Sequence, residues 1–406
     1  MALLLGAMAY VILASYAIAR PAIESIYLAH HSAETLPSVW LAVAAAAIIV
    51  VSAYNRACAR HALATVFGWA TVGSAVILVA LLTVESMDDL SPSIRAASAF
   101  MLYVWKDVYI VVLIEIFWSY ANVNFPPKSA RRTYGLFCAA GSLGGMSGNF
   151  GVGWLAIRYG TSATLWAVIP LLALAWGGCR LLENVSSEPP PRSTSSAGWK
   201  ANLRVLTESR YLPLILALIV TVQVVITLVD YEVNTFLQAT YPDKDVRTNM
   251  IGTIYGSIDV AALILQGLTG PILRILGLGS TMLAIPVLVA GAVAAAIAAP
   301  RFLTVAASKI VGKCLDYSLF RAGKEMFYLP LNYAEKTQGK ALVDMLTYRV
   351  AKGACALLLQ ALIALGLVAW AGPSALGLIV VWIVLTVIIV RRHREVESAK
   401  SELLEG

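Results

Sequence analysis

Long apolar segments separated by short polar ones run along most of the chain. A helix that crosses a bilayer needs about 20 predominantly apolar residues, and about twelve segments come close to that length. The predicted spans are Ala2–Leu28, Ser38–Tyr54, Leu63–Val84, Ala96–Ala121, Gly135–Arg158, Ala163–Leu182, Leu212–Leu237, Asn249–Ile275, Ser280–Ala299, Phe302–Phe327, Ala341–Trp370 and Ala375–Val390. The pattern predicts an all-α integral membrane protein.

A polar segment near the middle of the chain separates two sets of about six spans. It contains SSEPPPRSTSS, a composition typical of a flexible linker, followed by WKANLRVL, which is consistent with a short surface helix. We predict an N-terminal six-helix bundle at 1–183, a cytoplasmic linker at 184–211, a C-terminal six-helix bundle at 212–390 and a cytoplasmic tail at 391–406. Two pseudo-symmetric halves of this kind are the plan of major-facilitator transporters.

Basic residues between the spans indicate the orientation. With a cytoplasmic N-terminus, the inside segments hold Arg56, Arg60, Lys128, Arg131, Arg132, Arg192, Lys200, Arg204, Arg210, Lys336, Lys340 and the tail residues Arg391, Arg392 and Arg394. The outside loops then keep Arg95, Lys244 and Arg247. Lys and Arg accumulate in cytoplasmic loops, so both termini are predicted to be cytoplasmic.

Composition supports this class. The chain is 59% hydrophobic and 13% charged, whereas a soluble domain is about one quarter charged. The net charge of +7 fits basic cytoplasmic loops, so we expect no nucleic-acid partner. The five cysteines form no CxxC or Cys/His pattern, and Gly312-Lys313 lacks the rest of a P-loop. We expect neither an enzyme nor a metal or cofactor site.

Charged residues within the predicted spans are the candidates for function, because a charge in hydrocarbon costs about 2.5–3.5 kcal/mol on insertion scales. They are Arg20, Glu24, Lys106, Asp107, Glu115, Asp230, Glu232, Asp259, Lys313, Asp316, Arg321, Lys324, Glu325, Arg349 and Lys352. Acids and bases nearly balance. Pairing that holds the helices in register is therefore one expectation for each residue, and contact with a substrate is the other.

The tenth predicted span carries the densest charge, in SLFRAGKEM at 318–326. Lys313 and Asp316 can pair at i,i+3, and Arg321 and Glu325 at i,i+4. These spacings assign no obvious partner to Lys324 in its own helix.

A surplus of cations is predicted at the cytoplasmic side of the tenth and eleventh spans. Lys324, Arg349 and Lys352 all lie in the cytoplasmic half by residue count. They would suit an anionic, phosphorylated substrate. The alternative is that Lys324 and Arg349 extend to the membrane interface.

Two further patterns concern the halves and their packing. Aligning the fourth and tenth spans matches Asp107 with Asp316 and Glu115 with Lys324, as expected for an internal repeat. The glycines Gly141, Gly144, Gly145, Gly148, Gly151 and Gly153 crowd the fifth span. Small residues at this spacing allow close helix packing, and a bending helix is the functional alternative.

The segment SLFRAGKEMFYLPLNYAEKTQGKALVD, Ser318–Asp344, resembles the nucleotide (ATP/ADP) translocase family of plastids and intracellular bacteria. Supporting blocks are Glu115-Ile116-Phe117, the segment Ala130–Phe137 and Leu228-Val229-Asp230. The resemblance implies a major-facilitator-like fold with about twelve spans. It also implies roles in nucleotide exchange for Glu115, Asp230 and Lys324. Arg20 stands for the arginine of the family's first-span motif, and Ile23 occupies the position of its lysine.

The expected function is secondary transport of an anionic metabolite, nucleotide or nucleotide-like, by alternating access. Substrate-binding candidates are Lys324, Arg349, Lys352, Arg20 and Lys313; coupling or gating candidates are Glu115, Asp230, Asp107, Asp316 and Glu325. We expect a monomer in the lipid bilayer of a bacterial cytoplasmic membrane. The alternatives are a proton-coupled transporter of another small molecule, or a membrane sensor or scramblase that transports no solute.

Overall fold

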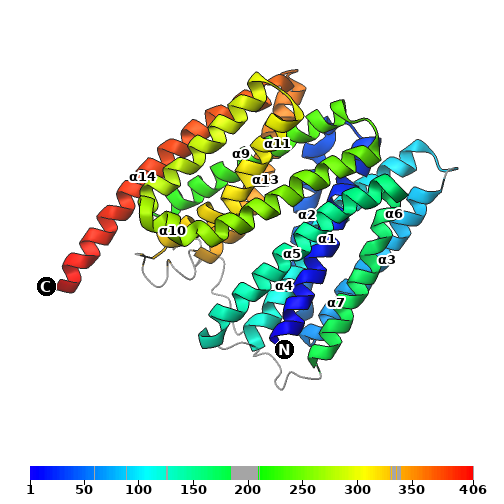
Figure 1. The fold of residues 1–406 in the computed structure, drawn as a ribbon, viewed down its shortest axis with the longest axis horizontal. Helices are drawn as coiled ribbons and strands as arrows, with labels where there is room; N and C mark the ends of the chain where they lie inside the picture. Colours follow the sequence, from blue (N-terminus) through cyan, green and yellow to red (C-terminus); the bar gives the residue numbers. More distant parts are fainter. Residues whose placement is uncertain are drawn as a thin grey trace. The chain divides into compact units, whose positions relative to one another are not determined.

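A computed structural model of the chain describes residues 1–58, 60–87, 89–124, 127–183, 209, 211–329, 331, 335 and 340–405. Every regular element in these ranges is helical, and they contain no strand (Figure 1). The predicted all-α class is confirmed. Side chains at 55, 123–124, 127–132, 183, 341–342, 344–350 and 396–405 lie outside the description, and that of Arg349 is among them.

The first half of the chain forms helices where spans are predicted. The elements are α1 (Ala2–His30), η1 (Ala33–Thr35), α2 (Leu36–Cys58), α3 (Leu63–Ser86), α4 (Pro92–Asn124), α5 (Pro127–Tyr159), α6 (Thr161–Thr164), η2 (Leu165–Ala167) and α7 (Val168–Glu183). The sixth predicted span thus consists of three consecutive helical pieces.

The second half of the chain also forms helices where spans are predicted, with two irregularities. Its elements are α9 (Leu212–Thr240), α10 (Lys244–Ala298), α11 (Phe302–Leu315), η3 (Asp316–Phe320), α12 (Arg321–Phe327), α13 (Lys340–Ala364), η5 (Val368–Trp370) and α14 (Ala371–Glu405). The predicted eighth and ninth spans both lie in α10, which is broken at Gly277, where φ is 73°. Glycine tolerates that backbone conformation because it has no Cβ. The tenth predicted span is interrupted by the π-helical turn η3.

Seven helical segments of the described residues are long and apolar enough to cross a membrane. The helix α4 is not among them, and it contains Lys106, Asp107 and Glu115. Nor is α11, which ends after 14 residues at η3. Both helices carry charged residues that are predicted to be functional. The total of about twelve spans stays a prediction.

The chain forms two compact units: Met1–Ser193 with Leu237–Val260, and Thr194–Phe236 with Ala261–Gly406. In the first unit, α1 packs against α4, α5 and α7 (Figure 1). Leu5, Ile12 and Ile23 of α1 are almost completely buried there. In the second unit, Trp382 of α14 is buried and its ring meets that of Phe320 edge to face, with centroids 6.0 Å apart.

The predicted boundaries of the two bundles stay predictions. The end of α9 and the start of α10 belong to the first compact unit, although they follow the predicted linker in sequence. Most of the linker predicted at 184–211 lies outside the described residues. The helix α14 continues through the predicted tail to Glu405.

Candidate functional site

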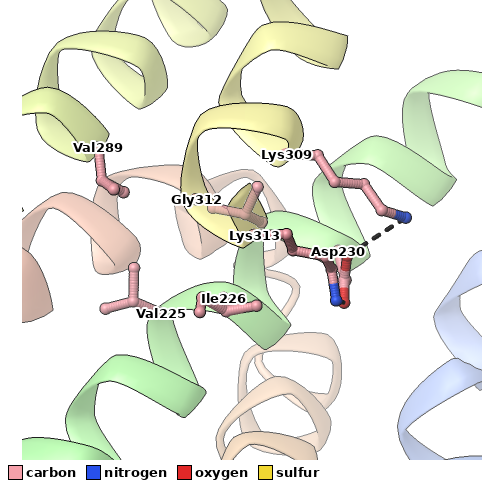
Figure 2. A pocket seen from close by; sticks show the side chains of 8 residues that line it. Val225, Ile226, Asp230, Val289, Lys309, Gly312 and Lys313 are labelled. Carbon is pink, nitrogen blue, oxygen red and sulfur yellow. Dashed lines mark ion pairs between the residues drawn. The ribbon is translucent and has the colours of Figure 1, made fainter. Parts of the chain in front are cut away.

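A buried ion cluster joins α9 and α11 within the second unit. Lys309 and Lys313 are one turn apart on α11, and both extend toward Asp230 on α9 (Figure 2). The Nζ of Lys309 lies 3.2 Å from Oδ1 of Asp230, and the Nζ of Lys313 lies 2.8 Å from Oδ2. The side chains of the two lysines are 2% and 9% exposed. We call these three residues the C-terminal charge cluster.

The C-terminal charge cluster has more positive than negative charge. Two ammonium groups face one carboxylate, so the three side chains sum to one positive charge when all are ionised. They border a small pocket of about 10 Å³, close to the space of one water molecule, with walls of Val225, Ile226, Val229, Val289 and Gly312 (Figure 2). Apolar walls lower the local dielectric constant and strengthen any interaction with an anion.

A second cluster lies in the first unit. Lys106 of α4 is 2% exposed, and its Nζ lies 2.9 Å from Oδ1 of Asp107 and 3.7 Å from Oε1 of Glu24 on α1. Arg20, one turn before Glu24, places its Nε 3.3 Å from the same Oε1. We call these four residues the N-terminal charge cluster. Its charges balance, as expected for a group that fixes two helices against each other.

Aromatic rings surround the N-terminal charge cluster. The hydroxyl of Tyr255 donates to the carboxylate of Glu24 at 3.3–3.4 Å, and the centroid of its ring lies 3.7 Å from the guanidinium carbon of Arg20. The Nζ of Lys106 lies 3.8 Å from the ring centroid of Tyr103. Cation–π contacts of this kind stabilise buried cations when water is excluded.

The two clusters share one arrangement. In each, an acid on the first predicted helix of a half, Glu24 or Asp230, pairs with lysine on the fourth predicted helix of that half. The fourth and tenth spans are also the helices that align in sequence through Asp107 and Asp316. That alignment pairs Lys106 with Leu315, so the lysines of the two clusters stand at different positions along the fourth helix of each half.

The other binding candidates lie on α12 and α13. Lys324 and Lys352 are both half-buried. Lys313, Arg321 and Lys324 are all within electrostatic range of Asp316, whose two carboxylate oxygens accept from Nε2 of Gln223 at 3.3 and 3.4 Å. Arg349 is also predicted to bind substrate, but its side chain is outside the part of the chain that the structure describes.

Two predicted pairings need correction. Lys313 forms its ion pair with Asp230 on another helix, whereas spacing suggested Asp316. Glu325 is exposed and pairs with Lys340 at the start of α13, whereas spacing suggested Arg321. Spacing within one helix reveals only neighbours on that helix. The observed partners come from other helices that pack against it. Glu115, predicted to couple or gate, is exposed on α4.

The structure also adds a residue that sequence inspection missed. Lys309 is 2% exposed, lies within the tenth predicted span and completes the C-terminal charge cluster. Its position four residues before Lys313 was the available signal, because i,i+4 residues share a helix face. Glu24 and Lys106 were recognised as membrane-embedded charges but were not assigned to a site. No group of metal-ligating side chains occurs among the described residues.

Comparison with known proteins gives a family and a set of relatives. The model of the family described as TLC ATP/ADP transporter matches residues 181–397. ADP,ATP carrier protein 1 of Chlamydia pneumoniae is 24% identical over 301 residues, which cover 62% of this chain and 58% of the relative. ADP,ATP carrier protein 2, chloroplastic, of Arabidopsis thaliana is 23% identical over 331 residues, covering 71% and 54%. The match thus spans little more than half the length of these relatives.

Two transporters are among the solved structures with the same fold. The nucleoside transporter NupG superposes with a TM-score of 0.68 at 11% identity, covering 97% of this chain and 98% of its own. A bacterial homologue of the iron transporter ferroportin, in its inward-facing state, gives a TM-score of 0.64 at 13% identity, covering 93% and 98%. At these identities the likeness shows the fold alone. Family and fold are those of multi-pass membrane transporters and not of enzymes.

Proposed function

Because the chain belongs to the TLC ATP/ADP transporter family, we propose that it is a secondary transporter that moves an anionic metabolite of the nucleotide class by alternating access. We place it in a bacterial cytoplasmic membrane, where it works as a monomer. The proposed substrate is a nucleotide because the curated relatives are named as ADP,ATP carriers.

The observation that carries the proposal is the positive charge of the C-terminal charge cluster. Lys309 and Lys313 are buried within a membrane protein, and both contact the carboxylate of Asp230. Cations are costly to bury in a membrane protein, and they are kept where ions or substrates bind or pass. Phosphate oxygens are strong acceptors for ammonium donors, so the two lysines carry the charge and the donors that a nucleotide's phosphates require.

The proposed roles of the side chains follow from their charge. Lys313, Lys324, Lys352, Arg349 and Arg20 would bind the anionic groups of the substrate. Asp230, Asp107, Asp316, Glu115 and Glu325 would pair with basic residues in one conformation and release them in another. Such exchange of partners lets a transporter alternate between two states of similar free energy.

The test is ligand-induced stabilisation of the purified protein in detergent. Thermal unfolding is measured with ATP, ADP, other nucleotides, phosphate, dicarboxylates, amino acids, peptides and metal chelates. A ligand at a hundredfold excess over its Kd stabilises the folded state by about 2.7 kcal/mol. We expect nucleotides to raise the unfolding temperature, and Lys324→Ala to abolish this rise while leaving the unliganded protein folded.

The matched control is Arg392→Ala, which removes a basic residue whose side chain is 51% exposed in α14. This variant should respond to nucleotides as the unmodified protein does. A nucleotide response that Lys324→Ala retains would remove Lys324 from the binding site. No response to nucleotides, together with a response to another compound, would replace the proposed substrate by that compound.

A further inference from the structure

A carboxylate with an uncharged partner lies in the first unit and takes no part in the ion pairs described above. Asp259 is 15 residues beyond Lys244 in α10, which places it about 22 Å along the helix and near the middle of a span. Nδ2 of Asn149 on α5 donates to Oδ2 of Asp259 at 2.8 Å. Among the described residues, no basic group lies within ion-pair distance of Asp259.

The charged groups near Asp259 are engaged with one another. The helix α1 presents Arg20, whose electrostatic influence reaches Asp259, but the Nε of Arg20 pairs with Glu24 and its guanidinium stacks on Tyr255. Tyr255, one turn before Asp259 on α10, donates its own hydroxyl to Glu24. The helix α5 presents Asn149 and Gly145, which are uncharged.

Asn149 provides an independent observation. The residue is 6% exposed, and its Oδ1 is buried with no hydrogen-bond partner. Buried polar atoms are satisfied in the large majority of cases, so an acceptor left without a donor needs an explanation. The amide therefore gives one hydrogen bond to Asp259 and has the capacity to receive one in return.

One added proton would satisfy both side chains. With the proton on Oδ1 of Asp259, the acid hydroxyl can donate to Oδ1 of Asn149 while Nδ2 of Asn149 continues to donate to Oδ2 of Asp259. A carboxylic acid and a carboxamide then form a closed pair with two hydrogen bonds. We propose that Asp259 and Asn149 form a proton-binding site, filled by a proton from water, and that its occupancy controls transport.

The position of this site suggests how a proton would act. A Cβ added to Gly145 would come within 2.8 Å of Oδ2 of Asp259, and one added to Gly256 within 2.7 Å of the ring of Phe150. The first part of α10 thus packs closely on α5. A negative charge within such a contact is unfavourable, whereas the neutral acid–amide pair stabilises it. Proton release would loosen the contact between α5 and α10, whichever anion is transported.

Infrared spectroscopy of the full-length, reconstituted protein tests the proposal directly. A protonated carboxyl group has a C=O stretching band that an ionised carboxylate lacks. We expect the unmodified protein to show such a band at a pH of about 5 and to lose it as the pH is raised to about 9. Asp259→Asn should lack this band.

The matched control is Asp316→Asn. Asp316 is a second half-buried carboxylate that accepts from an amide, that of Gln223, and it has Lys313, Arg321 and Lys324 within electrostatic range. This variant should keep the pH-dependent band. A band that persists in Asp259→Asn, or its absence from the unmodified protein across the whole range, would overturn the proposal.

Two further measurements keep the test decisive. If Asp259→Asn does not fold, Asn149→Ala takes its place: loss of the amide donor should move the band to higher frequency, and an unmoved band would contradict the pairing. Counterflow of the substrate found by thermal shift should depend on pH in proteoliposomes, and Asp259→Asn should remove at least most of that dependence. Equal pH profiles would contradict control by this site. The infrared result requires no substrate, so it stands apart from the test of nucleotide transport.

Discussion

Asp230 holds the charge balance of the C-terminal charge cluster, because it is the carboxylate that both lysines contact. Asp230→Asn would remove the negative charge that faces two buried ammonium groups. Removal of one partner from a buried ion pair costs about 3–5 kcal/mol. We expect a marked fall in the thermal unfolding temperature of the purified variant, without ligand.

Lys309→Met is the matched comparison at the same cluster. It leaves the contact between Lys313 and Asp230 in place, and methionine fills much of the volume of the lysine. We expect a loss below about 1 kcal/mol, or a gain, since apolar replacement of buried charge is often neutral or stabilising. Equal destabilisation by Lys309→Met and Asp230→Asn would show that the charge balance does not govern the stability of this cluster.

The N-terminal charge cluster allows a different prediction. Lys106→Met would leave Glu24 and Asp107 with Arg20, and should lower the free energy of unfolding by about 3–5 kcal/mol. The double variant with Glu24→Gln should lose less than the sum of the two single losses, with a coupling of about 0.5–3 kcal/mol. Chemical or thermal unfolding of the two single variants and the double variant measures the coupling energy. Additive losses would mean that Lys106 and Glu24 do not stabilise one another.

Sequence could identify the charged residues but not their partners. The cost of burying charge singled out Asp230 and Lys313 separately. Their contact depends on how α9 packs against α11, and a within-helix rule contains no information about that. Lys309 was missed because it appears in an otherwise ordinary apolar segment. The structure makes it visible by its burial and by its distance of 3.2 Å from Asp230.

At the scale of elements, the glycines of α5 have unequal surroundings. A Cβ on Gly148 would lie 2.7 Å from the carbonyl oxygen of Ala14 and 2.7 Å from Cβ of Ala17, both on α1. A Cβ on Gly151 would meet nothing within 4 Å. The predicted packing role therefore holds for Gly148, whereas Gly151 shows no neighbour that requires a glycine.

This contrast predicts opposite effects of the same substitution. Gly148→Ala should destabilise by about 1–3 kcal/mol, because α1 and α5 would have to move apart. Gly151→Ala should be neutral or stabilise by about 0.5–1 kcal/mol, because alanine restricts the unfolded chain more than glycine does. Thermal unfolding of the two variants side by side measures both. Equal effects would indicate that helix propensity, and not contact with α1, governs these positions.

The hydrophobic pattern is sufficient to predict where helices occur, but not how regular they are. Apolar length predicted helices in both halves, since a chain in lipid must satisfy its backbone hydrogen bonds internally. The pattern could not reveal the π-helical turn at Asp316–Phe320, because an inserted residue changes the register of a helix and leaves its hydropathy unchanged. That turn lies between Lys313 and Lys324 and reorients one relative to the other, so an angle calculated for a regular helix does not apply to this pair.

For the whole molecule, the distribution of basic residues predicts the orientation in the membrane. Arg391, Arg392 and Arg394 follow the last predicted span, and Lys or Arg near a span end favours the cytoplasmic side. A dual reporter joined after Gly406, with a fluorescent protein and alkaline phosphatase, should fluoresce in cells and show no phosphatase activity. The same reporter joined after Ala299, in a predicted outside loop, should give the reverse result.

Neutralising these three arginines tests whether they determine the orientation by themselves. Replacing Arg391, Arg392 and Arg394 by Gln removes the local bias while preserving the length of α14. The other inside loops still carry Arg56, Arg60 and further basic residues. Topology follows the sum of the Lys and Arg bias over all short loops. The reporter at the C-terminus should therefore keep its cytoplasmic signal with at most a modest loss. A complete inversion would mean that the tail alone orients the second half, and that the two halves insert independently of one another.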